Sequence, residues 1–181
     1  LEDLVNTSER VRPSKLKANP AEEILNPESP EVIEEVDATV DEAAAAFPCP
    51  GLTAWQAIKK LPELAWKKIL VSGAGGSVGQ YLTQFLLQAG AKVYATASSV
   101  HHEQLRRWGV TEVFDYKDQH LSQTIQNALH GCLFYAAFDM VSRENAATLV
   151  PLLGYYGHLV CVQDRLEQAP QPAFTTCISF H

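Results

Sequence analysis

The chain has 181 residues, of which 46% are hydrophobic, and its formal net charge is −7. This length suits one domain of ordinary size with an appendage, and the apolar content is sufficient for a buried core. The charge is uneven, because residues 1–42 hold 12 acidic and 4 basic residues while the remainder is close to neutral. No clustered basic face is present, so we exclude nucleic acid as a partner.

No apolar run approaches the ~18 to 20 residues that a membrane span needs, and the first residues lack the layout of a secretory signal. We therefore expect a cytoplasmic protein that has no membrane partner. The four cysteines are far apart in the sequence and form no C-x-x-C pair. This spacing predicts reduced thiols and no metal ligands.

Residues 1–40 differ from the rest in pattern, with four prolines, weak periodicity and many acidic side chains. They predict an irregular arm or the remnant of a preceding domain. From Asp41 the pattern changes, and residues 41–46 predict a short helix that Pro48 and Pro50 stop. A second helix is expected over residues 53–60.

From Lys68 onward, short apolar runs alternate with amphipathic segments that end at glycines. Such alternation predicts an α/β fold, a Rossmann-type doubly wound and mainly parallel six-stranded sheet with helices on both faces. The expected strands are 68–72, 92–97, 112–115, 133–139, 157–162 and 174–180, and the expected helices are 77–89, 103–108, 118–129 and 145–153.

The glycine-rich turn between the first strand and its helix is the principal candidate site. Gly73 would permit the tight turn out of the strand, and Gly79 would let the helix lie close to the sheet. The backbone amides of Gly76, Ser77 and Val78 would face a diphosphate at the positive end of the helix dipole. A glycine run alone is weak evidence, but its place between a strand and a helix predicts dinucleotide binding.

Other nucleotide chemistries fit these residues less well. A P-loop needs a lysine where Gln80 stands, so phosphoryl transfer is disfavoured. A short-chain dehydrogenase needs a Tyr-x-x-x-Lys pair, and none of the six tyrosines has a lysine four residues on. A methyltransferase commonly uses an acid to hold the ribose of its cofactor, and the second strand ends without one.

The end of the second strand reads Ala97-Ser98-Ser99, where NAD-binding domains usually place Asp or Glu. Serines can donate hydrogen bonds to a 2′-phosphate, and His101, His102 or Arg106 could add positive charge. This pattern favours NADP(H) as the cofactor, with NAD(H) as the alternative.

Residues 43–57, which read AAAAFPCPGLTAWQA, followed by Ile69 to Gly79, resemble the medium-chain dehydrogenase/reductase superfamily, in particular its alcohol-dehydrogenase-like and quinone-oxidoreductase-like branches. The resemblance covers residues 41–181. It implies an NAD(P)-dependent oxidoreductase that transfers a hydride to or from a carbonyl, enone, quinone or alcohol.

The same resemblance implies further cofactor contacts in this chain. Thr53 is expected near the nicotinamide end, and His102 stands where related sequences often carry lysine. The expected contacts to the adenosine phosphate are Ser98, Ser99 and Tyr116, and those beside the nicotinamide are Val141, Ser142, Val162 and Gln163.

Members of this superfamily are longer than this chain, so the resemblance implies a dinucleotide-binding domain, residues 41–181, that is part of a longer enzyme. The sequence assigns no catalytic residue, and a zinc ion in the full-length protein stays open. The alternative is a non-catalytic dinucleotide-binding or sensor module. Because residues 174–180 are β-prone and uncharged, we expect that this edge strand could pair with a second copy in a homodimer.

Overall fold

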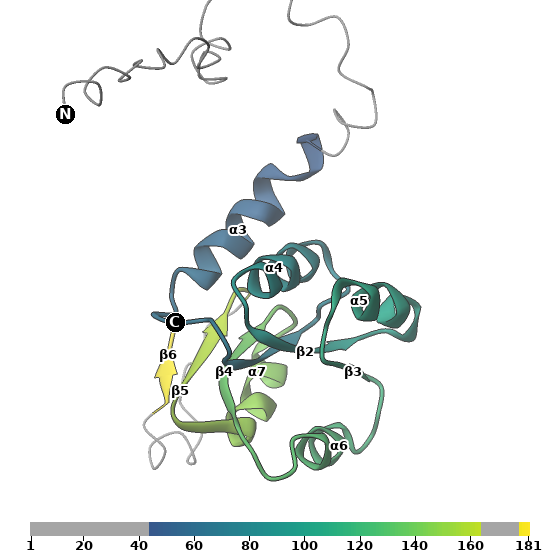
Figure 1. Ribbon diagram of the computed structural model, residues 1–181, viewed down its shortest axis with the longest axis vertical. Helices are drawn as coiled ribbons and strands as arrows, with labels where there is room; N and C mark the ends of the chain where they lie inside the picture. Colours follow the sequence, from purple (N-terminus) through teal and green to yellow (C-terminus); the bar gives the residue numbers. More distant parts are fainter. Residues whose placement is uncertain (1–43, 164–177) are drawn as a thin grey trace, which may run out of the picture. The chain divides into compact units, whose positions relative to one another are not determined.

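The computed structural model describes residues 44–163 and 178–181, which all belong to one compact unit, Glu42–His181. The expected arm, residues 1–40, lies outside the described residues. A six-stranded sheet organises the unit in the order β3-β2-β1-β4-β5-β6 (Figure 1). Each strand is parallel to its neighbours, which confirms the fold class expected from the sequence.

The strands are short, and the first three match the sequence prediction at both ends. Their bounds are β1 Lys68–Ser72, β2 Lys92–Ala97, β3 Glu112–Asp115, β4 Phe134–Asp139, β5 Leu153–Cys161 and β6 Ser179–Phe180. β5 begins four residues before the predicted strand 157–162, because Leu153 already pairs with Phe134 ahead of a register shift. β6 pairs with β5 as the predicted edge strand, and residues 174–177 lie outside the described part.

The helices between the strands are α4 Ser77–Gln88, α5 His102–Trp108, α6 Leu121–Ala128 and α7 Arg143–Leu149, with short 3₁₀ turns η1 Ser99–His101 and η2 Val150–Leu152. The helix predicted over 145–153 is thus α-helical only to Leu149. Pro151 has no amide hydrogen for the α-helical bond, and the chain tightens into η2 there. Within the described ranges, no helix combines the length and the apolar content that crossing a bilayer requires.

The helix before the sheet, α3, spans Pro48–Ile58 and corrects one prediction. Residues 44–46 are helical, but Pro48 and Pro50 begin the next helix instead of separating two helices by a gap. Proline suits the first turn because the amides there have no intrahelical acceptor. The first hydrogen bond of the helix is the one that the Gly51 amide donates to the carbonyl oxygen of Phe47, at 2.8 Å.

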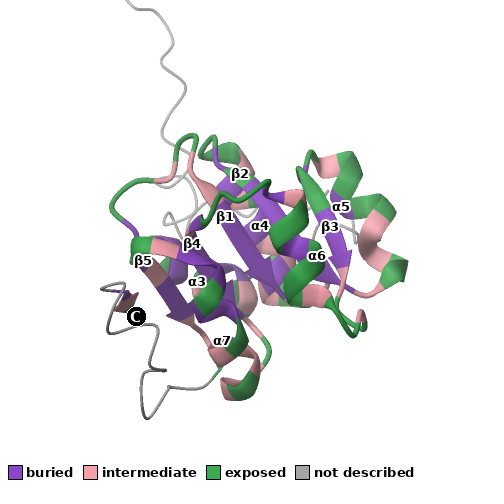
Figure 2. Cartoon of the chain, turned by 90° about the horizontal axis from the view of Figure 1, so that it is seen from below, coloured by how far each residue is buried: buried purple, intermediate pink, exposed green. Residues whose placement is uncertain are grey.

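Two apolar cores fill the two faces of the sheet, because successive strand residues point to opposite sides. One core joins the strands to α3, α4 and α5 through residues such as Leu82 and Leu105. The other joins them to α6 and α7 through residues such as Ile125 and Leu149. Figure 2 shows the buried strands between helices whose outer faces are exposed.

The strand order places a reversal at the centre of the sheet. The chain runs outward from β1 through β2 to β3, and then crosses to β4 on the other side of β1. The connections therefore leave β1 and β4 toward opposite faces, and a crevice opens beyond their carboxyl ends. Ligands of open α/β sheets bind at this point.

The packing of α4 on the first strand predicts a severe effect of Gly79→Ala. A Cβ at this position would lie 2.3 Å from the Gly73 carbonyl oxygen and 2.8 Å from the Cα of Ala74, and both are backbone atoms. We expect the substitution to lower the free energy of unfolding by about 1–3 kcal/mol, as overpacking does. Urea denaturation measures this, with exposed Gln84→Ala in the same helix as the control. An unchanged midpoint for Gly79→Ala would contradict the packing described here.

A histidine pair on the far strands predicts a pH dependence of stability. His158 on β5 places Nδ1 3.2 Å from Nε2 of His181. Burial, and then the charge of His181, lower the pKa of His158 below the ordinary histidine value. The unfolded chain therefore binds more protons than the folded protein just below that value, and stability falls as the pH falls.

We expect the melting temperature to drop as the pH falls from about 7 to about 5, the range in which histidines titrate. His158→Gln should remove part of this drop, whereas exposed His130→Asn should leave it unchanged. Thermal unfolding followed by circular dichroism at several pH values measures both. An identical pH profile for His158→Gln and the unaltered chain would refute the assignment.

Candidate functional site

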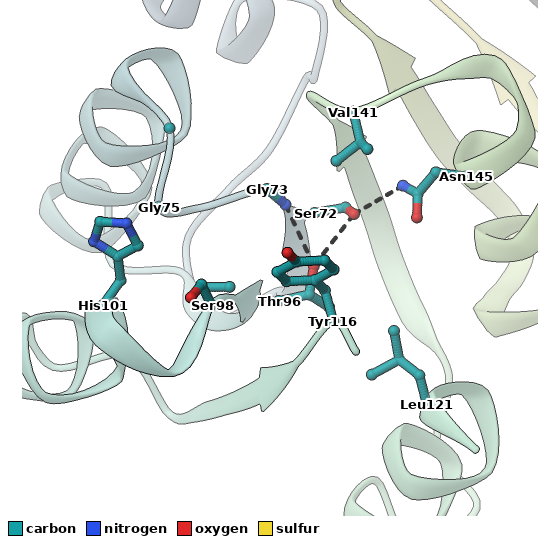
Figure 3. A pocket seen from close by; sticks show the side chains of 12 residues that line it. Ser72, Gly73, Gly75, Thr96, Ser98, His101, Tyr116, Leu121, Val141 and Asn145 are labelled. Carbon is teal, nitrogen blue, oxygen red and sulfur yellow. Dashed lines mark hydrogen bonds between the residues drawn. The ribbon is translucent and has the colours of Figure 1, made fainter. Parts of the chain in front are cut away.

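A cavity of about 430 Å³ lies at the carboxyl ends of four adjacent strands, β3, β2, β1 and β4. Its wall begins at the glycine turn after β1, passes the end of β2 and the residue after β3, and closes at the start of α7 (Figure 3). It therefore occupies the crevice that the strand order creates. Among the described residues that line it, none is Asp or Glu.

The glycine turn is held to the neighbouring strand by its own backbone. Gly73 has φ of +82°, a left-handed conformation that favours glycine. The amides of Gly73 and Ala74 both donate to the carbonyl oxygen of Thr96, at 3.2 and 3.0 Å, and the Gly76 amide donates to the Gly73 carbonyl at 3.1 Å. The turn is thus fixed in shape before any ligand binds.

The start of α4 has the features of an anion site. Gly76 precedes the helix, and no side chain caps it, so the first amides, including those of Ser77 and Val78, have no intrahelical acceptor. A Cβ on Gly76 would meet only the Gly73 carbonyl oxygen, at 3.6 Å, so the space above it is open. Gln80 Nε2 supports the turn from behind by donating to the Gly75 carbonyl at 2.9 Å. Bare amides, open space and the helix dipole together fit a diphosphate.

The end of β2 brings one histidine to the cavity. Ser98 and His101 line the wall, and the His101 ring lies against Gly75, where a Cβ would be 2.3 Å from the His101 Cδ2. Ser99 is exposed on η1. The ring of His102, selected from the resemblance, is instead engaged by the Ala97 carbonyl oxygen, 3.1 Å from its Nε2. The structure therefore brings His101, and not His102, to the cavity.

The part of the cavity wall that is formed after β3, at the start of α6 and after β4 is largely apolar. Tyr116 follows β3 and remains 55% exposed, and Leu121 is the first residue of α6. Val141 follows β4 and approaches the glycine turn, since its Cγ2 would lie 3.0 Å from a Cβ on Gly73. Figure 3 shows the Tyr116 ring and the Val141 and Leu121 side chains around the same space. Such a wall suits a flat apolar ring.

A chain of polar side chains runs beneath the cavity from β2 to α7. The hydroxyl oxygens of Thr96 and Ser72 are 3.3 Å apart, and Asn145 Nδ2 donates to Ser72 Oγ at 2.8 Å. Asn145 Nδ2 also donates to Asp139 Oδ1, and that oxygen accepts the Val141 amide at 3.3 Å. The carboxyl ends of three strands are therefore joined by side-chain hydrogen bonds.

The Asp139 carboxylate at the end of this chain is only 1% exposed. Burial raises the pKa of Asp139 above its ordinary value, because a charge is costly in a poorly hydrated place, while the donors Asn145, Val141 and Ser142 oppose that rise. The three donors thus favour the ionised form. A carboxylate that accepts backbone amides from the loop after β4 fixes the shape of that loop.

The remaining predicted residues lie away from the cavity wall or beside it. Thr53 Oγ1 donates to the Cys49 carbonyl within α3 at 2.8 Å, and Ser142 caps α7 by accepting the Asn145 amide at 3.3 Å. The Val162 amide donates to the Asp139 carbonyl at 3.0 Å, directly after β5. Gln163 is exposed, and none of these four residues lines the cavity.

Several lining residues were not predicted from the sequence. Ser72 and Thr96 carried a usable signal, since each is a polar residue near the carboxyl end of an otherwise apolar strand. Asn145 carried none, because an asparagine in the first turn of a helix is common. Within residues 44–163 and 178–181, no three His, Cys, Asp or Glu side chains form a group that could hold a metal ion.

The family model for zinc-binding dehydrogenases matches residues 77–176. The dehydrogenase orsE of Emericella nidulans is 31% identical over 137 residues, which cover 72% of this chain and 37% of that protein. The mouse mitochondrial NAD(P)H oxidoreductase RTN4IP1 is 33% identical over 61% of this chain and 31% of its own length. The trans-enoyl reductase tazE of Aspergillus terreus is 36% identical over 49% of this chain and 32% of its own.

Solved structures agree on the fold. An alcohol dehydrogenase superfamily protein from Novosphingobium aromaticivorans superposes with a TM-score of 0.70 at 22% identity, over 76% of this chain and 42% of that one. The CurK enoyl reductase gives a TM-score of 0.67 at 23% identity, again over 76% of this chain and 42% of that one. The chain thus spans about a third of the length of the curated relatives it matches. It belongs to the zinc-binding dehydrogenase family, within the medium-chain dehydrogenase/reductase superfamily, and contains the dinucleotide-binding domain of that superfamily.

Proposed function

We propose that this chain binds NADP(H) for an oxidoreductase that transfers a hydride to or from a carbonyl, enone, quinone or alcohol. One observation carries the proposal: the uncapped start of α4 and the open glycine turn face a cavity at the reversal point of a parallel sheet. The relatives include NAD(P)H oxidoreductases and trans-enoyl reductases, which supports the reaction class.

Each part of the wall has a role in this proposal. The amides of Gly76, Ser77 and Val78 bind the diphosphate, and the nicotinamide lies toward the ends of β4 and β5. When bound, the cofactor supplies or accepts the hydride, while the protein orients it and excludes water. Because the sheet is packed on both faces and α4 packs on one of them, the diphosphate site is formed on rigid elements.

The preference for NADP(H) over NAD(H) rests on the end of β2. An acid at this place would accept hydrogen bonds from the ribose 2′-hydroxyl and repel a 2′-phosphate. Here Ser98 offers a hydroxyl, and the His101 ring stands beside Gly75 at the same end of the cavity. The absence of Asp and Glu from the described lining residues supports this preference.

Three other expectations from the sequence stay predictions. A zinc ion in the full-length enzyme stays open, and homodimer formation would use the predicted edge strand, residues 174–180. A cytoplasmic location is also untested, and the matched mouse relative is named as mitochondrial. A non-catalytic sensor module would show NADPH binding but no turnover of any enone, quinone or aldehyde by the full-length protein.

Gly76→Ala tests the diphosphate site without a packing defect. Its new methyl group meets only one atom, at 3.6 Å, but it enters the space that the diphosphate needs. We expect the Kd for NADPH, measured by fluorescence titration, to rise at least about tenfold. The circular dichroism spectrum should be unchanged. Exposed Gln104→Ala is the control, and equal affinity of Gly76→Ala and the unaltered chain would overturn the proposed site.

Ser98→Asp tests the choice between the two cofactors. The added carboxylate should repel a 2′-phosphate and accept the 2′-hydroxyl of NADH instead. We expect NADPH affinity to fall about tenfold or more and NADH affinity to be retained or improved. Parallel titrations with both nucleotides measure the ratio. If the unaltered chain already prefers NADH, the NADP(H) assignment is wrong, while the diphosphate site stands.

A further inference from the structure

The side-chain amide of Asn145 lies in the cavity wall beside Ser72, on the side away from Ser98 and His101 (Figure 3). It belongs to the third residue of α7 and is half-buried. Neither the sequence motifs nor the proposed diphosphate and 2′-phosphate contacts use it. Its surroundings nevertheless determine which of its two polar atoms can meet a ligand.

Hydrogen bonds fix the orientation of this amide. An asparagine NH₂ group has two hydrogens, and here Nδ2 donates to Ser72 Oγ and to Asp139 Oδ1. The Asp139 oxygen also accepts the Val141 amide, so rotation of the Asn145 amide by half a turn would set the Asn145 oxygen against another acceptor. The oxygen Oδ1 is therefore left as the acceptor, turned away from Ser72 on the Leu121 side of the cavity (Figure 3).

The geometry also limits which part of a dinucleotide can reach this oxygen. With the diphosphate on the amides that begin α4 and the adenosine ribose beside Ser98 at the end of β2, the base must continue along the strand ends. Tyr116 and Leu121 line this stretch of the cavity and suit a flat apolar ring. Val141, which the resemblance placed beside the nicotinamide, lines the same stretch and would instead contact the base. Asn145 lies at the same stretch, so its oxygen meets the edge of the base.

We propose that Asn145 Oδ1 accepts a hydrogen bond from the exocyclic amino group of adenine, and that the Asp139 carboxylate and Ser72 hydroxyl hold the amide in this orientation. This proposal rests on the proposed function. It makes Asn145 a specificity-determining residue for the base and Asp139 a positioning residue that acts through it.

An acceptor held in one orientation favours a base that offers it a donor and also disfavours a base that offers it another acceptor. Hypoxanthine carries an oxygen where adenine carries the amino group, and two acceptors would then face each other. A freely rotating amide would turn its NH₂ group toward that oxygen, but the Asp139 carboxylate prevents the rotation here. A buried acceptor without a donor is costly, so the deamino analogue of the cofactor should bind about tenfold more weakly.

The test compares NADPH with its hypoxanthine analogue, nicotinamide hypoxanthine dinucleotide phosphate in reduced form. Fluorescence titration of the purified chain gives the two Kd values, and their ratio reports discrimination. We expect a ratio of about 10 for the unaltered chain, which is the cost of one unpaired acceptor. Exposed Asn127→Ala on α6 is the matched control and should retain the ratio.

Two variants test separately whether Asn145 contacts the base and whether Asp139 fixes the orientation of the Asn145 amide. Asn145→Ala removes the acceptor and should bring the ratio to about 1, mainly by weakening NADPH. Asp139→Asn keeps Asn145 but offers it a neighbour that can donate or accept, so the amide can rotate. We therefore expect Asp139→Asn to bring the ratio toward 1 by improving binding of the analogue, an effect that simple loss of packing would not produce.

The outcomes are distinguishable. Equal affinities of the unaltered chain for the two nucleotides overturn the role of Asn145 and leave the cofactor site standing. A ratio that Asn145→Ala does not change also overturns it. No binding of either nucleotide overturns the proposed function together with this inference. If Asp139→Asn does not fold, the comparison of the unaltered chain with Asn145→Ala still decides the contact, because that variant leaves Asp139 in place.

Discussion

The close approach of α4 to the turn after β1 is the contact on which the rest of the site depends. Gly79 lies so near the Gly73 carbonyl that a single methyl group would overlap two backbone atoms. This approach aims the start of α4 into the crevice between β1 and β4 and leaves its first amides uncapped. The partial positive charge of the helix is therefore presented at a fixed place, without any charged side chain.

The hydrogen-bonded side chains beneath the cavity are a second constraint on the site, because they join the carboxyl ends of β2, β1 and β4. Asp139 is buried under the crevice, and its charge is tolerated because amide donors surround it. The same carboxylate restricts the loop after β4 and the amide of Asn145. A group that is costly for folding thus gives the site a defined hydrogen-bonding pattern.

The two halves of the cavity offer different kinds of recognition. In the proposed function, backbone amides at the glycine turn recognise charge and would tolerate any nucleotide diphosphate. On the side of Asn145 and Tyr116, oriented side chains would recognise the shape and the hydrogen-bonding edge of a base. Affinity would therefore come mainly from the first half, and selection among nucleotides from the second half together with Ser98 and His101.

The sequence by itself determined the fold class and the position of the glycine turn between β1 and α4. Apolar runs and glycine stops depend on local periodicity, so the bounds of β1, β2 and β3 could be predicted residue by residue. Local rules failed where they permit two outcomes: proline can end a helix or begin one, and Pro48 begins α3.

Only the tertiary structure decided which side chains share the cavity. The turn η1 directs His101 to the cavity, while His102 is held by the carbonyl of Ala97. Ser72 and Asn145, 73 positions apart, meet because β1 and β4 are adjacent in the sheet. The orientation of the Asn145 amide depends on the buried Asp139. Contacts between distant segments follow from strand order and packing, which no local pattern in the chain specifies.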